Sequence, residues 1–194
     1  MSVDADTPFW LETERLILRD WTVADHEPFL RHTNTPDVMR WLGGVLDDTR
    51  AGGMIERLDA YRRDFGFTFW VVERKDDAGH LPGEILGFCG LKRANLPPGP
   101  LGDMEIGWRF RQDAWGQGYA KEAASAAMHA GFEQFEAPHM IALTMLENTP
   151  SWGLMLRLGM ERREDLDFEA EGDAAWAKNI AVWSITRRQW EENR

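Results

Sequence analysis

The pattern of hydrophobic and polar positions changes its period along this chain, and its first part predicts one strand followed by helices. Residues 14–21 (ERLILRDW) have the leucine and β-branched content of a short strand, and Thr22 is placed to cap the helical run that follows. Residues 36–42 and 47–65 predict two further helices. The apolar residues of the last helix recur with a helical period, at Met54, Ile55, Leu58 and Tyr61.

The middle of the chain changes to a strand pattern. Residues 67–74 (FTFWVVER), 84–91 (EILGFCGL) and 104–110 (MEIGWRF) are strand-like runs of apolar and aromatic residues. The turn-rich segments KDDAGHLPG and NLPPGPLG separate them. Connections this short predict antiparallel hairpins.

Helices and strands alternate again in the second half. Residues 118–135 predict a helix, and its small residues Ala120, Ala123, Ala124 and Ala127 lie along one side that can pack closely on a sheet. The remaining segments are a strand over 139–146, a helix over 149–160, and two strands over roughly 160–168 and 175–187. This order predicts a mixed α/β sheet with antiparallel meanders and a central strand–helix–strand unit.

The composition adds a single soluble domain to this picture. With 194 residues, 43% of them hydrophobic and 28% charged, the chain is long enough for one domain, 1–194, with a core of its own. Its apolar stretches are far shorter than a membrane span and lack the flanks of a signal peptide, so we expect no membrane association. The single Cys89 cannot form an internal disulfide, which favours the cytoplasm, and it is interpreted as a small buried strand residue.

Charge and histidine spacing argue against nucleic acid and metal ions as ligands. The formal net charge is −11 and no basic run occurs, so we expect no binding to nucleic acid. The five histidines have no paired ligand spacing, so we expect no metal site. The sequence leaves the oligomeric state open, a homodimer included.

Candidate chemistry lies in residues 111–123 (RQDAWGQGYAKEA). A predicted strand runs into Gly116 and Gly118, and a helix follows at once, so unpaired main-chain N–H groups and the positive end of the helix dipole meet there. Glycines allow a phosphate or diphosphate to approach such groups closely. The loop lacks the lysine and Ser/Thr of a P-loop and the third glycine of a dinucleotide fingerprint. Taken alone, it is equally typical of a tight strand-to-helix turn.

Two longer motifs carry a family resemblance. EIGWRFRQDAWGQGYAKEA, followed about thirty residues later by LTMLENTPSWGLMLRLGM, resembles the GNAT N-acetyltransferase superfamily, and in particular the branch that acetylates the N-termini of ribosomal proteins. The segments ETERLILRDW, LGFCGL and VWSITRRQW extend the resemblance over nearly the whole chain. It implies a mostly antiparallel mixed sheet of about seven strands, flanked by helices and splayed between the fourth and fifth strands. It also implies acetyl-coenzyme A as the donor, with its pantetheine arm in that split.

The resemblance also implies which residues bind the donor. The backbone of Ile106, Gly107 and Trp108 pairs with the pantetheine amides as a strand would. The diphosphate is held by the main-chain amides of Trp115, Gly116, Gln117, Gly118, Tyr119 and Ala120. Asp113 departs from the family pattern, which has Gln or Arg there, and its carboxylate would repel phosphate. Arg111 either supplies compensating positive charge or is a solvent-facing residue at the end of the strand.

Three further side chains are candidates for catalysis or donor binding, each with a structural alternative. Glu105 matches the carboxylate that removes the amine proton, commonly through water, and is otherwise an exposed acid at a strand end. Asn148 either reaches the pantetheine region or caps the helix after it, or does both. Ser151 either protonates the departing thiolate or caps a helix turn. Where many members of the family carry a tyrosine, this chain has Met155, which cannot donate a proton.

The expected reaction is direct acetyl transfer to a primary amine, on a peptide or protein N-terminus or on a small molecule. In this fold, residues 34–41 and 164–173 wall the acceptor side. The second segment carries six carboxylates in ten residues, which either attract a basic acceptor or form a solvated hairpin tip. The alternative function is a catalytically degenerate member that binds coenzyme A as a sensor or interaction module.

Overall fold

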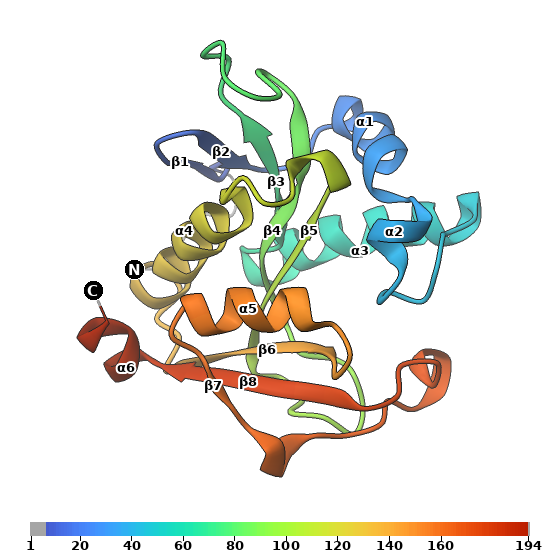
Figure 1. Ribbon diagram of the computed structural model, residues 1–194, viewed down its shortest axis with the longest axis vertical. Coiled ribbons are helices and arrows are strands. Elements are labelled where there is room, and N and C mark those ends of the chain that lie inside the picture. Colours follow the sequence, from blue (N-terminus) through green and yellow to red (C-terminus); the bar gives the residue numbers. More distant parts are fainter. Residues whose placement is uncertain (1–6, 194) are drawn as a thin grey trace.

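One mixed sheet organises the protein (Figure 1). The computed structural model describes residues 7–193, apart from the side chain of Asp173. Within them, eight strands lie in the order β1-β2-β3-β4-β5-β6-β8-β7. The strands are β1 (Trp10–Glu12), β2 (Leu16–Arg19), β3 (Phe69–Arg74), β4 (Ile85–Arg93), β5 (Met104–Phe110), β6 (His139–Met145), β7 (Glu161–Arg162) and β8 (Ile180–Thr186). The helices are α1 (Val23–Thr33), α2 (Pro36–Met39), α3 (Asp48–Phe65), α4 (Tyr119–Glu133), α5 (Thr149–Arg157) and α6 (Arg187–Glu192).

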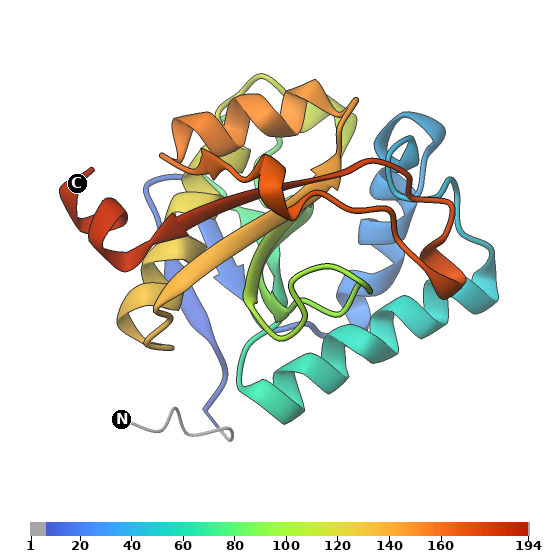
Figure 2. The same ribbon diagram turned by 90° about the horizontal axis from the view of Figure 1, so that it is seen from below.

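Helices cover both faces of the sheet, and Figure 2 shows α3 and α5 on opposite sides of it. The small residues Ala123, Ala124 and Ala127 of α4 are fully buried against the sheet, as the sequence pattern predicts. On the other face, Phe29 of α1 and Met54 of α3 form a second apolar cluster over Phe88 of β4. The predicted fold class, a mixed α/β sheet flanked by helices, is therefore confirmed.

The sheet separates at one place, between β5 and β6. β4 and β5 pair antiparallel along their length, from Gly87–Phe110 to Arg93–Met104. β5 and β6 are parallel and pair only at Glu105 and Ile141, after which they diverge. The predicted split between the fourth and fifth strands lies here, because β1 is a short strand that the sequence pattern did not reveal. One edge of β5 is thus left without a neighbouring strand.

Three predicted elements are markedly shorter than the pattern suggests, and one of them is the strand predicted over roughly 175–187, which begins only at Ile180 in β8. The helix predicted over 36–42 ends after one turn at Met39, since Gly43 and Gly44 both adopt positive φ angles and lead the chain away. The strand predicted over 160–168 is only β7, because the Val182 amide turns to the Asp167 carboxylate (3.1 Å) rather than to a strand carbonyl. Within the described residues, no helix is long and apolar enough to cross a bilayer, and no group of three or more His, Cys, Asp or Glu side chains is arranged to hold a metal ion.

Candidate active site

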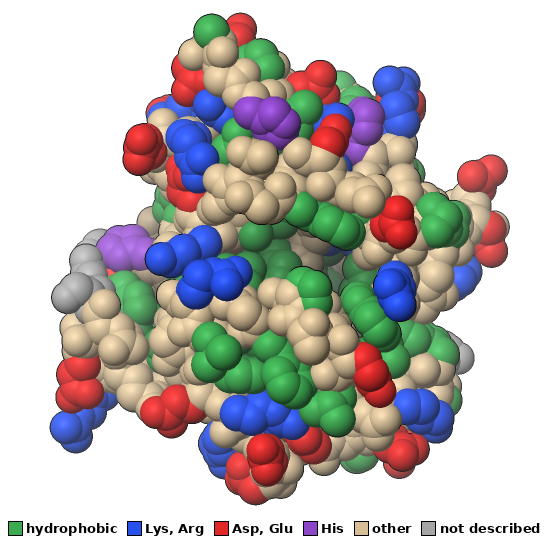
Figure 3. Space-filling model, viewed as in Figure 1, with side chains coloured by type: hydrophobic (Ala, Val, Ile, Leu, Met, Phe, Trp, Pro, Cys, Tyr) green, Lys and Arg blue, Asp and Glu red, His purple; other side chains and the backbone are tan. Residues whose placement is uncertain are grey.

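A cavity of about 660 Å³ opens where β5 and β6 diverge. Figure 3 shows this region as a hollow in the middle of the face, with hydrophobic side chains at its base. Its walls come from α2 and the loop after it, the end of β5, the bend before α4 and the first turns of α5. The lining residues are Asp37, Val38, Arg40, Trp41, Leu42, Trp108, Arg109, Phe110, Gln112, Ala114, Trp115, Gly116, Gly118, Ala120, Lys121, Asn148, Pro150, Ser151, Leu154 and Arg157.

The bend before α4 presents unpaired main-chain donors to this cavity. Gly116 and Gly118 have φ angles of 74° and 80°, a left-handed conformation that favours glycine. No described residue accepts a hydrogen bond from the main-chain N–H groups of residues 116–120. The Trp115 amide is the exception among the six expected donors, because it donates to the Gln112 carbonyl (3.1 Å) and closes a 3-10 turn. Three of these five amides belong to residues that line the cavity, Gly116, Gly118 and Ala120, and unpaired amides at a helix N-terminus suit an anion.

Contacts from behind hold the bend in this shape. The Arg15 Nη1 donates to the Gln117 carbonyl (3.0 Å), and its Nε pairs with Glu122 (2.7 Å) in the first turn of α4. The side chain of Tyr119 is buried, and its hydroxyl donates to the His80 carbonyl (3.1 Å). Gln117 and Tyr119 therefore contribute main-chain amides to the bend, and neither lines the cavity. Arg15 was not among the expected site residues, since nothing in the sequence marks a contact across more than a hundred positions.

The charge of Asp113 is neutralised locally. Both of its carboxylate oxygens accept from Arg111, at 2.6 Å from Nε and 2.8 Å from Nη2. Arg111 also donates to Glu84 (2.8 Å), and its side chain is buried, so it is not a solvent-facing residue. This ion pair lowers the pKa of the Asp113 carboxyl. Arg111 thus offsets the carboxylate that departs from the family pattern and does not itself line the cavity.

The free edge of β5 carries the main-chain groups of alternate residues. The Arg111 amide donates to Leu86 of β4 (2.8 Å), so by antiparallel alternation the groups of Ile106, Trp108 and Phe110 point away from β4, and beyond the single Glu105–Ile141 pair they face the open side. The Phe110 carbonyl accordingly accepts from the Trp115 indole (2.9 Å) across the bend. The main-chain groups of Gly107 face β4 by the same alternation. A side chain at this position would meet the Phe69 ring, whose nearest atom lies 2.8 Å from an ideal Cβ.

Glu105 is buried at the start of β5, so the alternative of an exposed acid at a strand end is wrong. Its Oε2 lies 3.0 Å from Lys92 Nζ on β4, without the alignment of a hydrogen bond. Burial raises the pKa of the Glu105 carboxyl, and the Lys92 ammonium opposes that rise. The carboxylate does not line the cavity, so any proton it receives from there has to pass through water. Lys92 was missed from the sequence because its pairing with Glu105 depends on the hairpin register.

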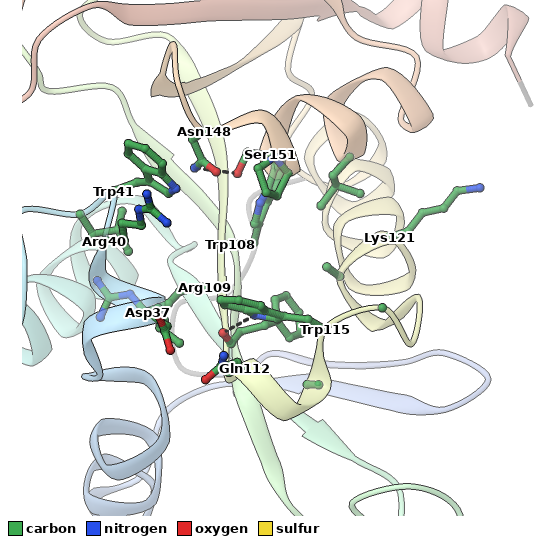
Figure 4. Close-up of a pocket in the computed structure, with 18 of the residues that line it drawn as sticks. Asp37, Arg40, Trp41, Trp108, Arg109, Gln112, Trp115, Lys121, Asn148 and Ser151 are labelled. Atoms are coloured by element: carbon green, nitrogen blue, oxygen red, sulfur yellow. Dashed lines mark hydrogen bonds between the residues drawn. The ribbon is translucent and has the colours of Figure 1, made fainter.

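Asn148 and Ser151 lie together on the wall of the cavity across from Trp115 and Gln112, as Figure 4 shows. The Asn148 Nδ2 donates to Thr144 Oγ1 (2.9 Å) and to Ser151 Oγ (3.1 Å). Asn148 occupies the N-cap position of α5, but its side chain makes no capping hydrogen bond. Since Ser151 Oγ accepts from Asn148, its own hydrogen is available to a group in the cavity. Met155 is buried beneath them and outside the lining.

The lining of the cavity is basic rather than acidic. None of the lining residues comes from 164–173, where carboxylates pair with nearby cations such as Arg163 with Asp165 (2.7 Å). Four lining residues are basic and one is acidic, against a net charge of −11 for the whole chain. The basic residues are Arg40, Arg109, Lys121 and Arg157, and the acidic one is Asp37.

Cys89 lies inside β4, fully buried and outside the cavity lining. Burial raises the pKa of its thiol. A protonated, inaccessible thiol is a poor nucleophile, so Cys89 is not placed to attack a group in the cavity.

Comparisons with known proteins agree with this geometry. The family described as Acetyltransferase (GNAT) domain matches residues 15–161, a span that holds the bend, Glu105, Asn148 and Ser151. The uncharacterized protein YkkB of Bacillus subtilis is 30% identical over 174 residues, 89% of this chain and 93% of that protein. The uncharacterized N-acetyltransferase YnaD of the same organism is 28% identical over 153 residues, 78% of this chain and 82% of its own.

Solved structures share the fold. An acetyltransferase from Agrobacterium tumefaciens is similar with a TM-score of 0.75 and 24% identity, covering 92% of this chain and 94% of that one. A putative ribosomal-protein-serine acetyltransferase from Vibrio cholerae has a TM-score of 0.70 and 20% identity, covering 92% and 97%. The family match over 15–161, together with the split sheet and the glycine bend that opens onto it, shows that this chain belongs to the GNAT acetyltransferase family.

Proposed function

We propose that the protein transfers an acetyl group from acetyl-coenzyme A directly to a primary amine. The observation that carries the proposal is the row of five unpaired amides, residues 116–120, beside the free edge of β5. Charge-assisted hydrogen bonds to such amides are worth roughly 1.5–3 kcal/mol each, which suits the diphosphate of this donor. The Ile106 and Trp108 main-chain groups would pair with the amides of its pantetheine arm. The basic lining adds attraction for an anionic donor despite the acidic surface.

The donor supplies a thioester, whose acetyl carbon is open to attack by a neutral amine. The Trp108 N–H, which faces the open edge of β5, is placed to stabilise the negative charge that develops on the carbonyl oxygen. The C–N bond forms as the C–S bond breaks. Ser151 donates its hydroxyl proton to the departing sulfur and is reprotonated through water, and Asn148 holds that hydroxyl in orientation.

The proton of the amine passes to Glu105 through water. At pH 7 an α-amino group costs about 1–1.4 kcal/mol to deprotonate and a lysine side chain about 4.6 kcal/mol, so an α-amine demands less of this base. Burial raises the pKa of the Glu105 carboxyl, which makes it a stronger base than an exposed glutamate, while the Lys92 ammonium opposes that rise. This arrangement favours an acceptor whose amine is an α-amine.

A thiol-release assay over a panel of amines tests the proposal. We expect release of coenzyme A with at least one class of primary amine, and a large fall in kcat for Glu105→Gln. The matched control is Glu56→Gln, on the exposed side of α3, which leaves kcat unchanged. Release that is equal in wild type and Glu105→Gln would contradict the role of this carboxylate.

A second candidate is a coenzyme A-binding module without turnover. Two observations favour it: Glu105 does not line the cavity, and the buried Met155 stands where a tyrosine would supply a proton. Binding of coenzyme A with no thiol release on any amine would support this candidate and remove the first.

A further inference from the structure

None of the four cations that line the cavity forms an ion pair among residues 7–193, and Arg109 is the one of them that is not exposed. Arg109 lies on β5, next to Trp108, and its guanidinium takes part in no ion pair within 4.0 Å among residues 7–193. Its Nη1 donates to the Met54 sulfur (3.3 Å), a weak acceptor, and its Nε is buried without any partner. The guanidinium carbon lies 5.1 Å from the centre of the Phe88 ring and 5.7 Å from that of Phe29.

Such an environment is unfavourable for a charge that stays unpaired. Burial lowers the pKa of the Arg109 guanidinium to about 10, so the group is still cationic at neutral pH. The two aromatic rings offset part of the cost, but they accept none of the planar N–H donors. A guanidinium binds carboxylates and phosphates through two parallel hydrogen bonds. The cavity is the side from which such a partner can arrive.

The diphosphate of the donor is not that partner. Side chains alternate along β5, so Phe110 packs in the cluster that includes α4, while Arg109 contacts residues of α1, α3 and β4 on the opposite face. The bend with the unpaired amides leads into α4. Figure 4 shows Arg109 reaching toward the wall formed by Asp37 and Arg40, whereas Lys121 points the other way. Asp37 is exposed and outside ion-pair distance of Arg109.

We propose that the acceptor is a small amino carboxylic acid, whose carboxylate Arg109 binds while its amine is acetylated. This inference rests on the proposed function and narrows its acceptor. Arg109 directly follows Trp108, whose amide is proposed to hold the reacting carbonyl, so the same end of β5 serves both groups. An acceptor that reaches both carries its carboxylate and its amine on one small molecule, as an amino acid does. Such an acceptor replaces the basic one expected from the acidic segment 164–173.

The test compares amino acids with the corresponding amino acid amides in the thiol-release assay, using the full chain. The carboxamide makes the amine less basic, which by itself favours the amide, so a preference for the acid has to come from recognition. We expect kcat/KM to be about 10- to 100-fold higher for the acids, the value of one charge-assisted hydrogen-bonded contact. We expect Arg109→Met to abolish that preference mainly by raising KM for the acids, while coenzyme A still binds. Arg188→Met, at an exposed position of α6, is the matched control.

Each alternative outcome is distinct. Equal turnover of acids and amides by the wild type would overturn this inference and leave the proposed function intact. Loss of affinity for coenzyme A in Arg109→Met would also overturn it, because the guanidinium would then bind the donor. Absence of release with every amine would overturn both proposals. If Arg109→Met does not fold, Arg109→Lys is the second variant, because it keeps the charge without the bidentate geometry. If this variant preferred acids as strongly as the wild type does, the proposal would be contradicted.

Discussion

The glycine at the centre of the bend offers a direct comparison between a ligand site and a tight turn. Gly116 has a φ angle of 74°, and no atom lies within 4 Å of an ideal Cβ there. Alanine at this position is therefore strained only by its backbone conformation, which costs roughly 1–2 kcal/mol for a residue with a side chain. At this chain length, each kcal/mol lowers Tm by about 2–4 °C. We expect Gly116→Ala to unfold at a slightly lower temperature and to remain folded at 25 °C.

Gly66 provides the matched control. It has nearly the same φ angle, 78°, and the same open space around an ideal Cβ, but it ends α3 and does not line the cavity. Gly66→Ala should therefore have a similar loss of Tm. Only at Gly116 does the added methyl group project into the space proposed for the diphosphate. Loss of one charge-assisted hydrogen bond there predicts an affinity for coenzyme A that is about 10- to 150-fold weaker.

Calorimetric titration of coenzyme A into the three proteins separates the two explanations. We expect wild type and Gly66→Ala to bind equally and Gly116→Ala to bind much more weakly. If Gly116→Ala bound as tightly as Gly66→Ala, the glycine would serve only the strand-to-helix turn. The reasoning from close approach would then be refuted.

The remaining predictions concern Arg109, Glu105 and Cys89. Arg109→Met replaces a half-buried charge without a counter-ion by an apolar side chain, so thermal unfolding should show no loss of stability; a clear loss would contradict the absence of a counter-ion. Because the pKa of Glu105 is raised, the acid limb of the pH profile of kcat/KM should have its midpoint above 4.5. Lys92→Met should move that midpoint to higher pH, because the ammonium no longer opposes the rise. An unchanged midpoint would show that Lys92 does not affect the pKa of Glu105. The raised pKa also makes the free energy of unfolding depend on pH. Glu105 contributes stability below the ordinary pKa of a glutamate, and this contribution is lost as pH rises through the pKa of the folded protein. Urea titrations should therefore show a smaller fall in the free energy of unfolding over that range for Glu105→Gln than for the wild type. Cys89 should react with a thiol reagent only on unfolding, and Cys89→Ala should retain kcat; fast labelling of the native protein would contradict its burial.

The sequence pattern predicted the parts of the fold that local periodicity determines. The alanines of α4 and the hairpins of β3, β4 and β5 followed from side-chain spacing and turn residues. The length of the strand that became β7 was overestimated. The Asp167 carboxylate accepts the Val182 amide in place of a strand carbonyl, and such a contact leaves no periodic signal in the sequence. The split between β5 and β6 came from the family resemblance and not from the pattern.

The site was predictable where main-chain geometry follows from residue type, as at Gly116 and Gly118. It was not predictable where function depends on which side chains meet. Lys92 beside Glu105 requires the register of two strands. The unpaired state of Arg109 requires knowing that no carboxylate of the described chain reaches it, and charge counts along the sequence pointed instead to the acidic segment 164–173.

The central claim is that main-chain amides at the start of α4 bind the diphosphate of the acetyl donor. Its most direct test is a calorimetric comparison of coenzyme A with pantetheine, which has the same arm without the diphosphate. We predict that coenzyme A binds at least about 100-fold more tightly, since several charge-assisted hydrogen bonds are lost with the diphosphate. Equal affinities, or no binding of coenzyme A by the folded protein, would contradict the claim.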